Sequence, residues 1–186
     1  MTVELTATDV RTAFTRREGP IGLLATDAPA LATACHAMAR RFHRGGRLIA
    51  FGAGGAAADA AHVVVEFVHP VIIGKRALPA LSLRGGSGGF RAELELFAEP
   101  EDIALAIAPD GGDAALADAL AAARDRGLLT VALAGAADGP LNRSSPDHVL
   151  VVHSDDPRIV REGQVTTYHV LWELVHVFLD APEVLA

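Results

Sequence analysis

The chain has 186 residues, of which 51% are hydrophobic and 21% charged, and this composition excludes a disordered or fibrous protein. Its 16 basic and 23 acidic residues give a formal charge of -7, so no basic surface is available for a nucleic-acid backbone, and nucleic acid is not an expected partner. One cysteine, no signal-like start and no apolar run of membrane-spanning length predict a cytoplasmic protein with no internal disulfide and no membrane partner.

The N-terminal part of the chain, at about residues 8–45, is predicted to form helices. Its second half, DAPALATACHAMARRFHRGG, has Pro29 near its start and ends in a glycine pair. Apolar residues recur there at helical intervals, namely at Leu31, Cys35, Met38 and Phe42. This pattern predicts an amphipathic helix with one face in the core.

Five short, nearly continuous apolar runs follow and alternate with helix-like segments. They are RLIAFGA, ALPALSL, DIALAIA, LLTVALAG and HVLVVHS. Such runs are typical of strands buried on both faces, and strands alternating with helices form parallel sheets. The chain is therefore predicted to be a single α/β domain over residues 1–186, a three-layer α/β/α sandwich with a five-stranded parallel sheet in a core at about 47–154. Two stretches, RGGSGGFRAE and AADGPLNRSSPD, are expected to be irregular loops.

Ligands of such sheets bind beyond the carboxyl ends of the strands. The first run ends in Gly52-Ala53-Gly54-Gly55, and the helix that follows at once would present backbone N–H groups to an anion. A dinucleotide site is the alternative, because Gly52, Gly54 and Ala57 loosely match the Rossmann fingerprint. The acidic residue expected about 20 positions later is missing, which disfavours nicotinamide and flavin cofactors.

His62 and Glu66 lie four residues apart on this helix and therefore project from the same side. A pair of this kind can share a metal ion or a proton. A surface pair is the alternative, but the neighbouring valines and Phe67 indicate a largely buried helix, in which a carboxylate needs a partner. The pair is expected to point toward the loop at Asp110.

A last helix, at about residues 158–180, carries four polar residues within a sector of about 60°. They are Glu162, His169, Glu173 and His176. The other faces are apolar, so this helix is predicted to be buried or to lie in a subunit interface. His169 is assigned to the site with His62 and Glu66, whereas Glu173 and His176 are interpreted as an interface pair.

Two segments carry a specific resemblance: GAGGAAADAAHVVVEF followed by LPALSL, and REGQVTTYHVLWELVH. They are similar to the phosphoheptose isomerase family of sugar isomerase (SIS) domains. The resemblance implies a homotetramer or homodimer with active sites between subunits, and a sugar or sugar phosphate as ligand. The family reaction interconverts sedoheptulose 7-phosphate and a heptose 7-phosphate through an enediol. By resemblance, Glu66 and His169 are the acid/base pair, and His62, Glu66 and His169 could hold zinc.

The chain departs from the family pattern at several positions. Ala56 replaces a serine, Pro70 replaces an arginine, and Arg161 replaces a metal-binding glutamine. The serine- and threonine-rich phosphate loop is replaced by Ala108-Pro109-Asp110-Gly111-Gly112-Asp113, in which Asp113 is expected to cap the next helix. The candidate substrate-binding residues are Gly54, Gly55, Ala56, Asp110, Gly111, Gly112, Asp113 and Arg161.

Two hypotheses of different classes follow. In the first, the chain is an isomerase or a related catalyst that keeps Glu66 and His169 for proton transfer but uses a changed substrate or no metal. In the second, it is a binding or assembly protein that keeps the fold as a scaffold. Arg161 cannot ligate a metal, because it stays protonated and offers only donors, and it is expected to pair with Glu66 or Glu162. Zinc is therefore expected to bind weakly.

Overall fold

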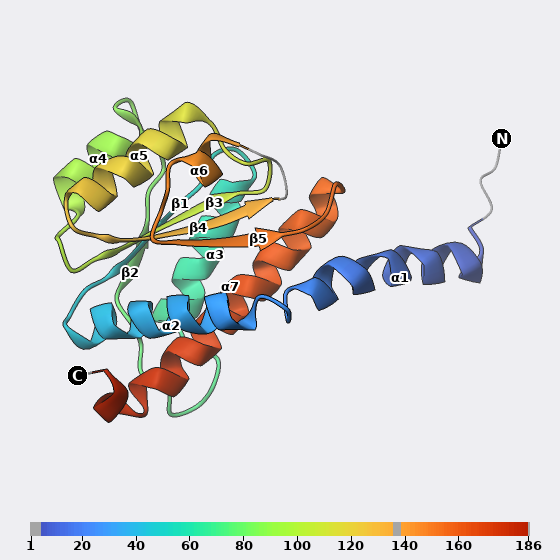
Figure 1. Ribbon diagram of the computed structural model, residues 1–186, viewed down its shortest axis with the longest axis horizontal. Coiled ribbons are helices and arrows are strands. Elements are labelled where there is room, and N and C mark those ends of the chain that lie inside the picture. Colours follow the sequence, from blue (N-terminus) through green and yellow to red (C-terminus); the bar gives the residue numbers. More distant parts are fainter. Residues whose placement is uncertain (1–4, 136–138, 186) are drawn as a thin grey trace.

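A five-stranded parallel sheet in the order β2-β1-β3-β4-β5 forms the middle layer (Figure 1). The computed structural model describes residues 5–135 and 139–185. The strands are β1 (Leu48–Phe51), β2 (Ala80–Ser82), β3 (Ile103–Ala108), β4 (Leu129–Gly135) and β5 (His148–Val152). All four neighbouring pairs run parallel, and the three central strands are buried throughout. The predicted sheet and its five strands are confirmed.

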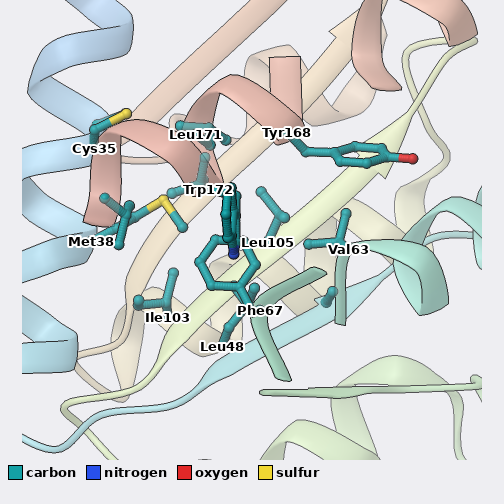
Figure 2. Packing of buried hydrophobic residues seen from close by; sticks show 14 of the residues in the cluster. Cys35, Met38, Leu48, Val63, Phe67, Ile103, Leu105, Tyr168, Leu171 and Trp172 are labelled. Atoms are coloured by element: carbon teal, nitrogen blue, oxygen red, sulfur yellow. The ribbon is translucent and has the colours of Figure 1, made fainter. Parts of the chain in front are cut away.

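Helices cover both faces of the sheet, which is why the central strands are apolar on both sides. One face is covered by α2 (Ala28–His43), α3 (Ala56–Val68) and α7 (Pro157–Leu179), and the other by α4 (Gly89–Phe97), α5 (Ala114–Asp125) and α6 (Pro140–Arg143) (Figure 1). Figure 2 shows the first of these cores, to which α3 contributes Phe67, β3 contributes Leu105 and α7 contributes Trp172. The second helix, α2, buries Cys35, Met38 and Phe42 as its spacing predicts.

Residues 84–93 were expected to be an irregular loop, and this prediction is wrong in part. Helix α4 begins at Gly89, whose φ of 72° is a conformation that glycine adopts without strain. The Glu93 carboxylate accepts hydrogen bonds from the N–H groups of Arg84, Gly85 and Gly86, and these bonds tie the loop to the helix. Because glycine disfavours helix, helix propensity does not predict a helix that begins in this glycine-rich stretch. The second expected loop likewise contains the short helix α6, and its first residues lie outside the described ranges.

Helix α1 (Ala7–Leu23) extends away from the rest of the chain and has no buried residue (Figure 1). Its apolar side chains Val10, Phe14 and Leu23 are exposed, as are Val71 and Ile73 after α3. A single helix of this length is marginal in water unless a face packs on something. In the described ranges, no helix has both the length and the apolar character needed to cross a membrane.

We therefore expect a homo-oligomer, in which a second copy covers α1. The apolar faces of α2 and α7 are a weaker reason for this expectation, because their largest side chains, such as Met38, Phe42 and Trp172, are buried within their own chain. The exposed side chains of α1 are the stronger reason. Light scattering at micromolar concentration is expected to give a multiple of 19.3 kDa, and a monomer would contradict the prediction.

Candidate functional site

His62, Glu66 and His169 meet where α3 crosses α7. The Nε2 atom of His62 lies 3.0 Å from Oε1 of Glu66, and the Nε2 atom of His169 lies 3.7 Å from the same oxygen. The two imidazole rings contact each other edge to face, with centroids 5.3 Å apart. Residues that are more than 100 positions apart in the sequence thus form one cluster, as the sequence analysis expected.

The carboxylate lies deeper in this cluster than the two imidazoles. The Glu66 side chain is 14% exposed, whereas those of His62 and His169 are 46% and 42% exposed. The prediction that α3 is largely buried holds for only one face, because Val63 and Phe67 are buried but Val65 is exposed. The cluster is therefore open on its outer side, where a ligand can reach it.

Tyr168 is a member of this cluster that the sequence analysis missed. Its hydroxyl lies 2.8 Å from Nδ1 of His62, and its ring contacts both His62 and His169. Burial, followed by the nearby charges of Asp59 and Glu66, raises the pKa of Tyr168 to about 12, so the phenol keeps its proton. The available signal was its position beside His169 in a mostly apolar helix, where it is the chain's only tyrosine.

A second feature lies at the carboxyl ends of the strands, where a cavity of 310 Å³ opens between the two glycine loops. Six of the eight candidate substrate-binding residues line it, namely Gly55, Ala56, Asp110, Gly112, Asp113 and Arg161. Gly54 and Gly111 belong to the same loops but are not among its lining residues. Within residues 5–135 and 139–185, the residues that line this cavity carry no hydroxyl group.

The two aspartates of this cavity accept hydrogen bonds from backbone N–H groups. Oδ1 of Asp113 accepts a hydrogen bond from the Leu116 N–H at 2.8 Å, which confirms that Asp113 caps α5. Oδ1 of Asp110 accepts from the Gly112 N–H at 3.1 Å. These are donors that an anion would otherwise use at the start of a helix. The cavity therefore suits a ligand that donates hydrogen bonds.

Arg161 was expected to pair with Glu66 or Glu162, and this prediction is wrong. Its Nη2 atom lies 2.9 Å from Oδ2 of Asp59 and also donates to the Gly55 carbonyl. Glu162 instead binds Arg17 of α1. Adjacent residues on a helix point about 100° apart, so Arg161 faces α3 while Glu162 faces α1. The charge of Arg161 is thus largely offset by Asp59.

The cluster and the cavity are separate in this chain. His62 and Glu66 face α7 and do not line the cavity at Asp110, so their expected orientation toward that loop is wrong. His62 and Glu66 lie six and ten residues beyond Ala56, which corresponds to about 9 Å and 15 Å along the helix. The salt bridge between Arg161 and Asp59 lies between the cavity and the cluster.

His176 and Glu173 do not form the pair that was expected of them. His176 is buried, and its ring nitrogens lie within hydrogen-bond distance of the Trp172 and Arg76 carbonyls. Glu173 is exposed. His176 is therefore a satisfied core residue of its own subunit.

Comparisons with known proteins agree with this architecture. The chain is 35% identical over 187 residues to the phosphoheptose isomerase of Pelobacter propionicus, and the match covers 93% of this chain and 98% of that protein. The family model for the SIS domain matches residues 22–135. The chain belongs to the phosphoheptose isomerase family of SIS domains. The resemblance expected from the sequence is confirmed.

Solved structures share the SIS fold of this chain. A phosphoheptose isomerase from Francisella tularensis superposes with a TM-score of 0.80 at 23% identity, covering 92% of this chain and 98% of that one. The sugar isomerase domain of the RpiR transcription factor from Sphaerobacter thermophilus superposes with a TM-score of 0.67 at 22% identity, covering 92% and 90%. At these identities the likeness concerns the fold alone.

The residues of this SIS domain fit a zinc ion. One ligand atom from each of His62, Glu66 and His169 lies within 4.8 Å of the others. Imidazole nitrogen and carboxylate oxygen are zinc donors, and catalytic zinc sites commonly have three protein ligands and one open position. Around a tetrahedral ion with bonds of about 2.1 Å, ligand atoms lie about 3.4 Å apart, close to the spacing of this cluster.

Replacing Arg161 by glutamine is expected to strengthen zinc binding about tenfold. Arg161 lies eight residues before His169, about 12 Å along α7, where a unit charge repels a zinc dication by about 2.8 kcal/mol at an effective dielectric constant of about 20, and salt screening over this distance reduces the repulsion by roughly half. The zinc affinities of the native protein and of Arg161→Gln are measured by competition with a chromophoric chelator for zinc. Arg158→Gln, an exposed arginine at the start of the same helix, is the control. Stoichiometric zinc in the purified, untagged native protein would contradict the expected weak binding.

Proposed function

We propose that this chain is an aldose–ketose isomerase, which moves a proton between adjacent carbons of a sugar with Glu66 as base and His169 as acid. The supporting observation is the Glu66 carboxylate, which is held between two imidazoles and yet lies in a cluster open to solvent. Both imidazole contacts fall on Oε1. Among the described residues, this leaves Oε2 as the oxygen that can take a proton from the substrate.

The reaction follows from these positions. Glu66 removes the proton from C1 of a ketose, the electron pair reaches O2, and His169 donates a proton there to give the enediol. Glu66 then returns its proton to C2 while the O1 hydroxyl gives its proton to His169, which yields the aldose. Zinc, when bound to His62, Glu66 and His169, supplies an electrophile that stabilises the charge on oxygen.

The far end of the sugar is proposed to carry hydroxyl groups in place of a phosphate. The cavity at Asp110 and Asp113 offers carboxylates, which accept hydrogen bonds from hydroxyls and repel a dianion. Because the cluster residues of α3 lie about 9 to 15 Å along the helix from the cavity, we propose that the complete site is formed between two copies of the chain.

Proton exchange in D₂O tests the proposal directly. Native protein incubated with sedoheptulose is expected to exchange one of the two hydrogens at C1 for deuterium, which NMR detects even when net conversion is slow. Sedoheptulose 7-phosphate is compared at the same concentration. Absence of exchange with both sugars, and with other ketoses of five to seven carbons, would contradict the isomerase proposal.

The second candidate is a sugar-binding or assembly protein without catalysis. It is favoured by the Arg161–Asp59 salt bridge. By resemblance, a metal-binding glutamine stands at this position in the family, whereas here an arginine paired with Asp59 offers no metal ligand. The SIS fold also occurs in a protein described as a transcription factor. Binding of a sugar in calorimetry, without deuterium exchange, would select this candidate.

A further inference from the structure

Tyr168 occupies the boundary between the core and the cluster. Its ring belongs to the core formed by α2, α3, α7 and the sheet, and Figure 2 shows its oxygen pointing out of that core beyond Val63. The residue is fully buried, and a buried hydroxyl without a partner is costly. The partner that the structure gives it is Nδ1 of His62, at 2.8 Å.

This hydrogen bond has a defined direction. The carboxylate of Glu66 can only accept, so Nε2 of His62, 3.0 Å from Oε1, is the nitrogen that carries the proton and donates it. In a neutral imidazole Nδ1 is then an acceptor, and the Tyr168 hydroxyl donates to it. Tyr168, His62 and Glu66 thus form a chain of two hydrogen bonds that runs from α7 to α3.

His62 needs such a restraint because its side chain is 46% exposed. An exposed side chain on a helix ordinarily samples several rotamers. A contact to Glu66 restrains the His62 ring little, because both side chains belong to the same helix and can change rotamer together. The hydrogen bond to Tyr168 restrains it more, because Tyr168 lies on a second helix and is held by packing.

We propose that Tyr168 is a positioning residue that holds the imidazole of His62 with Nε2 on Glu66, and so orients the carboxylate toward the substrate. The catalytic meaning of this role rests on the proposed isomerase function. The orientation of His62 does not, and it can be measured in the absence of any substrate. A phenylalanine would fill the same space in the core, so packing alone gives no reason for the hydroxyl.

The first test compares Tyr168→Phe with Thr167→Val. Thr167 is the adjacent buried residue, and its hydroxyl donates to the Gly163 carbonyl within α7, so the control also removes one buried hydroxyl. Histidines labelled with ¹⁵N are observed at a pH two units above the ordinary histidine pKa of about 6.5, and His62 is assigned with His62→Gln. Tyr168→Phe is expected to shift the Nδ1 resonance of His62 to that of a nitrogen without a hydrogen bond. Thr167→Val is expected to leave it unchanged.

A second measurement reads the same bond from the tyrosine. Since the chain has one tyrosine, ¹³Cζ labelling gives a single signal, and His62→Gln is expected to shift it in an otherwise native protein. This arm also decides the proposal if Tyr168→Phe fails to fold. An unchanged Nδ1 resonance in folded Tyr168→Phe, or an unchanged tyrosine signal in His62→Gln, would overturn the proposal.

The kinetic consequence is tested separately. With a sugar that the native protein exchanges, Tyr168→Phe is expected to lower kcat about tenfold with little change in KM, because residues that orient a site partner typically contribute a factor of about 10 to 100. Thr167→Val should retain native kcat. If the native protein exchanges no sugar, the isomerase proposal fails, and the NMR results still decide the role of Tyr168.

Discussion

Sedoheptulose 7-phosphate is expected to bind this protein no more tightly than millimolar and to be turned over at a negligible rate. A phosphate dianion at a helix start is held by backbone N–H groups and hydroxyls, and each hydrogen bond to a charged group contributes about 1.5 to 3 kcal/mol. The described residues that line the cavity at the strand ends carry no hydroxyl, and the Leu116 N–H already donates to Asp113. Losing three or four such bonds, discounted for non-additivity, removes about 4 kcal/mol, or roughly a thousandfold in affinity.

Calorimetric titration with sedoheptulose 7-phosphate measures this affinity. One substitution is expected to restore part of it. Asp113→Ser keeps a side chain that can cap α5 but replaces a repelling carboxylate by a hydroxyl, so it is expected to tighten sedoheptulose 7-phosphate binding at least about tenfold. Asp125→Ser makes the same change of charge at the exposed end of α5 and should have no effect. Micromolar binding by the native protein would show that backbone donors suffice for the phosphate and would contradict the prediction.

Glu66→Gln is expected to lower deuterium exchange into a sugar substrate about a thousandfold. A glutamine has nearly the shape of glutamate and can still accept a hydrogen bond from His62, but it cannot take a proton from carbon. General base catalysis contributes a factor of about 10² to 10⁴. Because the side chain is only 14% exposed, thermal unfolding is measured alongside the rate to separate lost chemistry from lost folding.

The matched control is Glu173→Gln, an exposed carboxylate on α7. It makes the same chemical change one helical turn beyond His169, and it should retain the native rate. If Glu66→Gln exchanged deuterium within a factor of about ten of the native rate, another group would have to be the base. The proposed role of Glu66 would then be wrong.

Much of the fold was predictable because its signals are local. The five apolar runs each form a strand, the spacing of Cys35 and Met38 places them on the buried face of α2, and Asp113 caps α5. These outcomes depend on the period of one element or on the residue at its end, which a sequence displays directly. Helix α4 escaped prediction because its start is rich in glycine and is held by bonds from Glu93 to the preceding loop.

The candidate site was predictable only in part. The four-residue spacing of His62 and Glu66 places both on one side of α3, and the interpretation of the last helix assigned His169 to the same site. The partner of Arg161 was predicted wrongly, and Tyr168 was not predicted at all. Both depend on how α3 and α7 cross, which sets the residue that faces each side chain across the contact.

The sequence by itself therefore determined the elements, their order and the residues that share a helix face. Only the tertiary structure decided that Asp59 binds Arg161, that Tyr168 reaches His62, and that the cluster lies apart from the cavity at Asp110. The physical reason is that helical periodicity relates residues of one helix to each other. Contacts between helices depend on their crossing position, and a shift of one residue turns a side chain by about 100° toward a different partner.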